Sequence, residues 1–96
     1  MKDSKALWKK SKNIILNGNS LFSKNPENYA KDWPAYFDRA KGCYIWSIDK
    51  KKFIDFSYMG IGTNILGYSN TKIDNHVKKI ITKGTMSTLN CTEEVT

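Results

Sequence analysis

The chain has 96 residues, of which 40% are hydrophobic, and its formal net charge is +7. A domain of this size buries only about 60–65% of the surface that its unfolded chain exposes, so its core is thin. No apolar run approaches the ~18 residues that cross a bilayer, and the lysine-rich N-terminus lacks the apolar stretch of a signal peptide. We therefore expect a folded, cytoplasmic chain with no membrane partner.

Two cysteines and one histidine are too few for a metal site, because zinc sites need four ligands in close spacing. Cys43 and Cys91 are expected to be free thiols, since disulfides are rare in cytosolic chains. His76 has no nucleophile near it in the sequence. We predict a surface residue there and not a catalytic base.

The positive charge is compatible with a nucleic-acid or anionic-surface function. However, Arg39 is the only arginine and the lysines are spread along the whole chain, whereas base readout and stacking favour arginine. We therefore expect no nucleic-acid partner. A small basic module that binds nucleic acid or an anionic surface remains the alternative, and lysines clustered beside exposed aromatic side chains on one sheet face would favour it.

Residues 3–15 are predicted to form an N-terminal helix, because apolar side chains recur there at helical spacing. Asp3 or Ser4 can cap its start with a side-chain oxygen. A long polar connection follows over residues 17–34. A connection of that length is uncommon inside a compact domain and is often functional, so we interpret it as a wrapping segment.

A small three-stranded antiparallel sheet is predicted next, because the segment is rich in aromatic and β-branched residues. The strands are expected at residues 35–40, 43–48 and 53–56. Asp49 is expected to bind backbone amides of its own turn, and Asp55 to hold a local loop. Lys50 to Lys52 are predicted to form a solvated turn, and the three tryptophans to be buried by packing.

A glycine-rich loop over residues 57–70 and an amphipathic helix over 71–84 complete the predicted α+β fold. Gly60-Ile61-Gly62 lacks the third glycine and the helix context of a dinucleotide site. Asn90 with Glu93 has the outline of a capping box for one more helix. Because the chain stops where that helix would start, we interpret it as truncated.

The order of these features resembles the N-terminal signature of the class III aminotransferase family. The residues that carry the resemblance are Ala40-Lys41-Gly42, Trp46, Asp49, Phe53-Ile54-Asp55-Phe56, Gly60, Gly62 and Ile65-Leu66-Gly67-Tyr68. The first helix followed by Gly18-Asn19-Ser20 is similar to the glutamate-1-semialdehyde aminomutase branch. In that branch an arginine that pairs with the substrate carboxylate stands where this chain has Leu21-Phe22-Ser23, so the substrate stays open.

The resemblance implies a fold-type I enzyme, either an aminotransferase or an aminomutase, that uses pyridoxal 5'-phosphate (PLP). It also implies a small-molecule amino substrate and a homodimer with its active site at the subunit interface. In the family the lysine that holds the cofactor lies downstream of this region. Residues 1–96 are therefore expected to be an incomplete N-terminal segment without the large cofactor-binding domain, and inactive alone.

The resemblance also implies positions on the substrate side, while no residue is assigned as catalytic, cofactor-binding or metal-binding. These positions are Ser20, Met59, Gly60, Ile61 and Gly62. The loop from Met86 to Asn90 is expected to approach the same pocket. A free-standing interaction domain is the third hypothesis, and it predicts that residues 1–96 fold cooperatively alone. The enzyme-fragment hypothesis predicts the opposite, because the helix and sheet would expose apolar faces.

Overall fold

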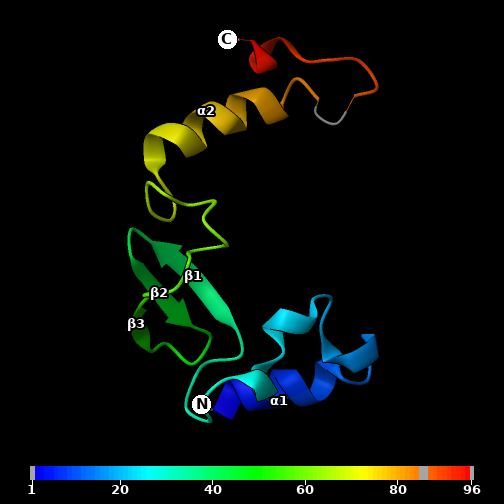
Figure 1. Cartoon of the computed structure of the whole chain (residues 1–96), viewed down its shortest axis with the longest axis vertical. Coiled ribbons are helices and arrows are strands. Elements are labelled where there is room, and N and C mark those ends of the chain that lie inside the picture. Colours follow the sequence, from blue (N-terminus) through cyan, green and yellow to red (C-terminus); the bar gives the residue numbers. More distant parts are fainter. Residues whose placement is uncertain (1, 85–86, 96) are drawn as a thin grey trace.

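A computed structural model of the chain describes residues 2–84 and 87–95. Figure 1 shows three parts in succession: helix α1 with the turns that follow it, a small sheet, and helix α2 with the C-terminal segment. The principal dimensions are 45 × 29 × 20 Å, so the molecule is elongated. The predicted α+β fold, with two helices and a three-stranded antiparallel sheet in the described ranges, is confirmed.

Helix α1 spans Lys2–Ser11, so it ends at Ser11 rather than at the predicted residue 15. The hydroxyl of Ser11 donates to the carbonyl oxygen of Trp8 at 2.9 Å. Side-chain bonds of this kind compete with the helical hydrogen-bond ladder. By Ile15 the backbone is extended, with φ of −116° and ψ of 131°. The prediction of a helix over 3–15 is therefore wrong for its last turn.

The first turn of α1 is held by Asp49, which lies 45 and 46 positions away from the two residues that it binds. Its carboxylate oxygens accept hydrogen bonds from the backbone N–H groups of Asp3 at 2.8 Å and of Ser4 at 3.1 Å. The N–H groups of a first helical turn need such acceptors, and a negative charge suits the helix dipole there. This corrects two expectations: Asp3 and Ser4 lie inside the helix, and Asp49 binds amides far from its own turn.

The connection after α1 folds back along the helix. It contains 3-10 turns at Leu16–Gly18, Phe22–Lys24 and Pro26–Asn28. The Oε1 atom of Glu27 accepts hydrogen bonds from Lys12 Nζ at 2.6 Å and from Trp8 Nε1 at 3.4 Å. The Lys12 bond, followed by the Trp8 bond, lowers the pKa of Glu27. These contacts are those expected of a wrapping segment.

The sheet has the strand order β1-β2-β3, and both neighbouring pairs are antiparallel. The strands are β1 (Phe37–Lys41), β2 (Tyr44–Ser47) and β3 (Lys52–Ile54). β1 starts later than predicted, and a register shift between Phe37 and Arg39 interrupts its pairing. Gly42 makes the turn into β2 with a φ of 57°, which a residue without Cβ adopts most easily.

Helix α2 spans Thr71–Ile81 and is capped by Asn70, whose Oδ1 accepts from the Ile73 N–H at 3.3 Å. At the other end, the Thr82 hydroxyl donates to the Lys79 carbonyl oxygen at 2.7 Å. The helix therefore stops three residues before Gly84, the expected end.

The predicted capping box near the C-terminus is displaced by one residue. Glu94 accepts a hydrogen bond from the Cys91 N–H at 3.3 Å, so Cys91 and Glu94 take the roles expected of Asn90 and Glu93. Glu93 instead forms an ion pair with Lys83 at 3.1 Å. The element that follows is a 3-10 turn at Thr92–Glu94.

The described residues contain no buried apolar side chain, and the fully buried side chains are those of Ser4 and Ser47. Ile73, Val77 and Ile81, which share one face of α2, are 45%, 44% and 58% exposed. Apolar surface of this extent normally marks a region that other protein covers. Neither helix within these ranges has the length and apolarity that a membrane span needs.

The tryptophans are not buried, which corrects their predicted role. Trp33 is 61% exposed and stacks on Tyr29 with 5.6 Å between ring centroids. Trp8 and Trp46 are half-buried. The reason is the missing apolar core, since none of the residues that the structure describes forms a second layer over α1 or the sheet.

The Asp49→Ala variant should loosen α1, because the N–H groups of Asp3 and Ser4 lose their acceptors. The Ser4 hydroxyl, and then the backbone N–H groups, hold the pKa of Asp49 below its usual range. This contribution to stability is therefore present above the ordinary carboxyl pKa of about 3.9, and it is lost as pH falls through the lower folded value. Amide hydrogen exchange in α1 measures this loss of stability. Asp38→Ala, which removes the same charge at another position, is the control. Equal protection of α1 in both variants would contradict the cap.

Residues 1–96 alone should bind the dye ANS and unfold over a broad range of urea concentration, because apolar faces lack a covering layer. The double variant Ile73→Gln, Val77→Gln should bind less dye, whereas Lys78→Gln, Lys79→Gln should bind as much as the parent. A sharp, cooperative urea transition with no dye binding would support the free-standing domain instead.

Candidate functional site

Asp55 joins the end of the sheet to the glycine-rich loop and to the segment before α2. Its Oδ1 accepts from the Ser57 N–H at 2.8 Å, and its Oδ2 accepts from the Tyr68 hydroxyl at 2.5 Å. Tyr68 and Gly42 also exchange two backbone hydrogen bonds of 2.9 Å. The loop over residues 57–70 is thus closed at both ends, which confirms the prediction that Asp55 holds a local loop.

Two further contacts fix this junction. Gly67 has a φ of 86°, and a Cβ added to it would lie 3.2 Å from the backbone of Gly42, so this close approach needs glycine. The Nζ atom of Lys41 donates to the Ser69 carbonyl oxygen at 2.6 Å and to Thr71 Oγ1 at 3.0 Å. Together these contacts set where α2 leaves the sheet.

The Asp55–Tyr68 pair shifts the ionisation of both groups. Partial burial, followed by the hydrogen bond to the Asp55 carboxylate and its charge, raises the pKa of Tyr68 to about 12. Partial burial also acts to raise the pKa of Asp55, but the hydrogen bonds from the Ser57 hydroxyl, the Tyr68 hydroxyl and the Ser57 N–H together outweigh it. The pKa of Asp55 therefore lies below its usual value.

Four consecutive residues of the loop have a left-handed backbone. The φ angles are 44° at Met59, 77° at Gly60, 60° at Ile61 and 76° at Gly62. A β-branched residue rarely adopts positive φ, and backbone strain of this kind occurs most often at functional sites. The Ile61 side chain is 80% exposed, so this segment presents it outward.

Local hydrogen bonds hold this left-handed segment in shape. The Asn64 amide donates to the Met59 carbonyl oxygen at 2.9 Å, and the Thr63 hydroxyl donates to the Gly60 carbonyl oxygen at 2.7 Å. The Gly62 N–H donates to the Tyr58 carbonyl oxygen at 2.6 Å. Hydrogen bonds among residues 58–64 therefore fix the shape of the segment.

Ser20 lies elsewhere, in a hollow of about 700 Å³ between α1 and the turns that follow it. The hollow is lined by Trp8, Lys12, Asn17, Asn19, Ser20, Phe22, Asn25 and Glu27. Gly18 lies at its edge, and a Cβ there would lie 2.5 Å from the Trp8 ring. The buried Nδ2 atom of Asn19 has no hydrogen-bond partner among the described residues, although buried polar groups normally have one.

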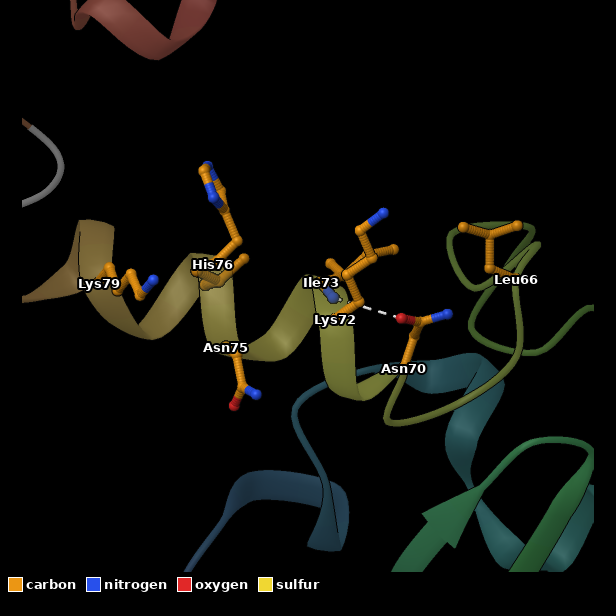
Figure 2. A pocket seen from close by; sticks show the side chains of 8 residues that line it. Leu66, Asn70, Lys72, Ile73, Asn75, His76 and Lys79 are labelled. Carbon is orange, nitrogen blue, oxygen red and sulfur yellow. Dashed lines mark hydrogen bonds between the residues drawn. The ribbon is translucent and has the colours of Figure 1, made fainter.

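A second hollow, of about 560 Å³, runs along the exposed side of α2. In Figure 2, Ile73 and His76 project from the same side of the helix, and Leu66 lies on the neighbouring loop. No carboxylate, hydroxyl or thiol side chain lines this hollow. His76 is exposed, as expected of a surface residue. The hollow is therefore part of the uncovered apolar face and offers no acid–base pair.

The predicted substrate-side positions fall into two separate places. Figure 1 shows the segment that contains Ser20 beside α1, and the loop that contains Met59–Gly62 beyond the sheet, toward α2. The structure therefore does not bring Ser20 to this loop. In the loop expected near the same pocket, Met86 lies outside the described residues, and the Ser87 hydroxyl accepts from the Leu89 N–H at 3.1 Å.

The described residues form neither a disulfide nor a metal-binding cluster. Cys43 and Cys91 are free and exposed, as predicted. Within residues 2–84 and 87–95, no group of His, Cys, Asp and Glu side chains is placed to hold a metal ion.

No family model matches the chain. Among curated proteins, the glutamate-1-semialdehyde 2,1-aminomutase of Nitrosopumilus maritimus is 37% identical over 86 residues, which is 90% of this chain and 19% of that protein. The aminomutase of Thermoplasma acidophilum is 34% identical over 77 residues, 77% of this chain and 18% of that protein. The chain thus spans about a fifth of the length of the curated relatives that it matches.

Solved structures give the same fold. The FumI protein of Sphingopyxis sp. MTA144, in a PLP form, superposes on 99% of this chain and 22% of its own, with a TM-score of 0.83 and 24% identity. An omega-transaminase from Sphaerobacter thermophilus covers 96% of this chain and 20% of its own, with a TM-score of 0.78 and 20% identity. The fold is therefore that of part of a PLP-dependent transaminase.

These findings confirm the resemblance to PLP-dependent aminotransferases of class III. Within that class, the relatives at 29–37% identity are glutamate-1-semialdehyde 2,1-aminomutases. This chain corresponds to one part of those proteins.

Sequence reasoning missed the pairing of Asp55 with Tyr68 and the role of Asp49 at α1. The aspartate that follows β3 was recognised, but its second partner lies 13 positions on, beyond an irregular loop. Nothing in the residues around Asp49 indicates a helix 45 positions earlier. Both contacts depend on how separate elements meet, which no local pattern carries.

Titration should separate Tyr68 from the other tyrosines. Its pKa of about 12 lies above the ordinary value of about 10, so its hydrogen bond stabilises the fold below pH about 10 and is lost as pH rises through about 12. Phenolate absorbance should show a late step that Tyr68→Phe removes. Tyr58→Phe, a change in the same loop, should leave that step in place. If the late absorbance step persisted in Tyr68→Phe, it would not come from Tyr68, and the contact with Asp55 would be contradicted.

Proposed function

We propose that this chain is the N-terminal segment of a PLP-dependent aminotransferase or aminomutase that acts on a small-molecule amino substrate. The observation that carries the proposal is the 37% identity over 90% of the chain with a glutamate-1-semialdehyde 2,1-aminomutase. The shared fold and the uncovered apolar face of α2 support it, because a larger domain would cover such a face. The complete enzyme is a cytoplasmic homodimer in this proposal.

The described residues do not by themselves form a PLP-binding site. Lys12 lines the hollow beside Ser20, but its Nζ donates to Glu27 at 2.6 Å and lies 5.0 Å from the Trp8 ring centroid. That lysine is therefore engaged and not free to hold the cofactor. When bound, PLP supplies an electron sink for amino transfer, and the residues that bind it lie outside this segment in our proposal.

The contribution of this segment is to the substrate side. The left-handed backbone at Met59–Gly62 presents Ile61 as an apolar contact, and the Asp55–Tyr68 junction holds the loop in place. Ser20 offers a hydroxyl next to the buried Asn19 amide. These groups bind and orient a substrate, and none of them moves a proton in the reaction. In this proposal, Ser20 and the Met59–Gly62 loop contact one substrate only in the complete protein.

The test starts from the coding sequence beyond Thr96. In the complete protein, Ile61→Ala should lower kcat/KM for the amino substrate about tenfold or more, because one apolar contact in a pocket discriminates by about that factor. Ile14→Ala, at another exposed isoleucine, should leave kcat/KM unchanged. A stop codon directly after Thr96 in an intact, expressed gene would overturn the enzyme proposal. Equal effects of the two variants would overturn the role of the loop.

A further inference from the structure

On one face of the sheet, cationic and aromatic side chains that are separated in the sequence lie next to one another. Arg39, Trp46 and Lys52 lie directly opposite one another on β1, β2 and β3. Directly opposite residues of an antiparallel pair point to the same side of the sheet. Tyr44 lies two residues before Trp46 on β2 and therefore shares that side. Lys41 is opposite Tyr44, at the edge of the same group.

The cations and rings alternate at close range. The Arg39 guanidinium carbon lies 3.8 Å from the Trp46 ring centroid, and Lys52 Nζ lies 3.7 Å from that of Tyr44 and 5.5 Å from that of Trp46. The two rings are 6.2 Å apart and tilted by 54°. Contacts of this kind hold the cations by their attraction to the ring faces and leave their N–H donors unused.

The carboxylates of the sheet region are all engaged elsewhere. Asp38 pairs with Lys50 at 2.9 Å, Asp49 binds the first turn of α1, and Asp55 binds Ser57 and Tyr68. Among the described residues, no ion pair reaches Arg39 or Lys52. The positive charge of this face is therefore not neutralised within the part of the chain that the structure describes.

The Nζ atom of Lys41 donates to the Ser69 carbonyl oxygen and to Thr71 Oγ1, so this lysine is already engaged. We propose that the cationic aromatic face formed by Arg39, Tyr44, Trp46 and Lys52 binds single-stranded nucleic acid. Phosphates would accept hydrogen bonds from Arg39 and Lys52, and bases would stack on the guanidinium plane and on the ring surface that the two cations leave uncovered. An acidic peptide would satisfy the cations but would leave the aromatic surface without a stacking partner. The lysines looked spread in the sequence, and the sheet provides the clustering that this function needs.

The proposal stands apart from the aminotransferase function. It uses one face of the three strands and none of the substrate-side positions, so either proposal can fail without the other. Single-stranded nucleic acid is preferred over duplex because the face is short and stacking needs unpaired bases.

Binding of a fluorescently labelled 20-nucleotide oligo(dT) to the complete protein tests the proposal by anisotropy over a range of salt concentrations. Two phosphate contacts predict a slope of log K against log salt of about −1.4, since each contact on a single strand contributes about −0.7. Arg39→Gln and Lys52→Gln should each lower the slope by about 0.7 and weaken binding several-fold. Arg39→Lys should retain the slope, which separates loss of charge from loss of fold.

Two matched variants control for net charge. Lys9→Gln and Lys78→Gln remove the same charge from α1 and α2, and they should leave the slope unchanged. Trp46→Leu should weaken binding about fivefold or more through lost stacking.

Four results would overturn the proposal. The first is an equal loss of affinity in the controls and the face variants, which would indicate non-specific attraction. The second is competition by poly-glutamate as effective as by unlabelled oligo(dT), which would indicate an acidic protein partner. Tighter binding of a duplex of the same length would indicate a double-stranded partner, and no binding at low salt would leave the face without a nucleic-acid role.

Discussion

The Asp55 carboxylate decides how the two halves of this chain meet. One of its oxygens holds Ser57 at the start of the glycine-rich loop, and the other holds Tyr68 at its end. Together with the two backbone hydrogen bonds between Tyr68 and Gly42, these bonds fix the span of the loop that carries the left-handed segment at Met59–Gly62 and leads into α2. The close approach of Gly67 to Gly42 depends on the same junction, since a Cβ there would press on the backbone that Tyr68 pairs with.

A second constraint is the single layer of the structure. The sheet and both helices have apolar side chains, yet no described apolar residue is buried. Stable domains bury such faces between two layers. The contacts that define this chain are consequently polar: the Asp49 cap, the Glu27 bonds to Lys12 and Trp8, and the Asp55 junction. Polar contacts give direction and register, whereas the burial of apolar surface supplies most of the driving force for folding.

Sequence patterns predicted the order and type of the elements because these follow from local chemistry. The amphipathic pattern over residues 71–84 predicted α2, which begins at Thr71 and ends three residues early, at Ile81. The aromatic and β-branched residues gave the sheet, with strand ends shifted by one or two residues. The end of α1 was missed because the Ser11 hydroxyl binds a carbonyl of the preceding turn. The candidate site was harder to predict from the sequence, because the residue types Met59 and Ile61 do not indicate a left-handed backbone.

The Asp49 cap has a consequence for the order in which the molecule is made. The N–H groups of α1 leave the ribosome first, but the carboxylate that satisfies them follows 45 positions later. At about 5–20 residues per second, that interval amounts to several seconds of synthesis. During that time α1 is a short helix of ten residues without its acceptor, below the length at which isolated helices persist in water. The nascent chain therefore completes its first element only after the β2–β3 hairpin turn has emerged.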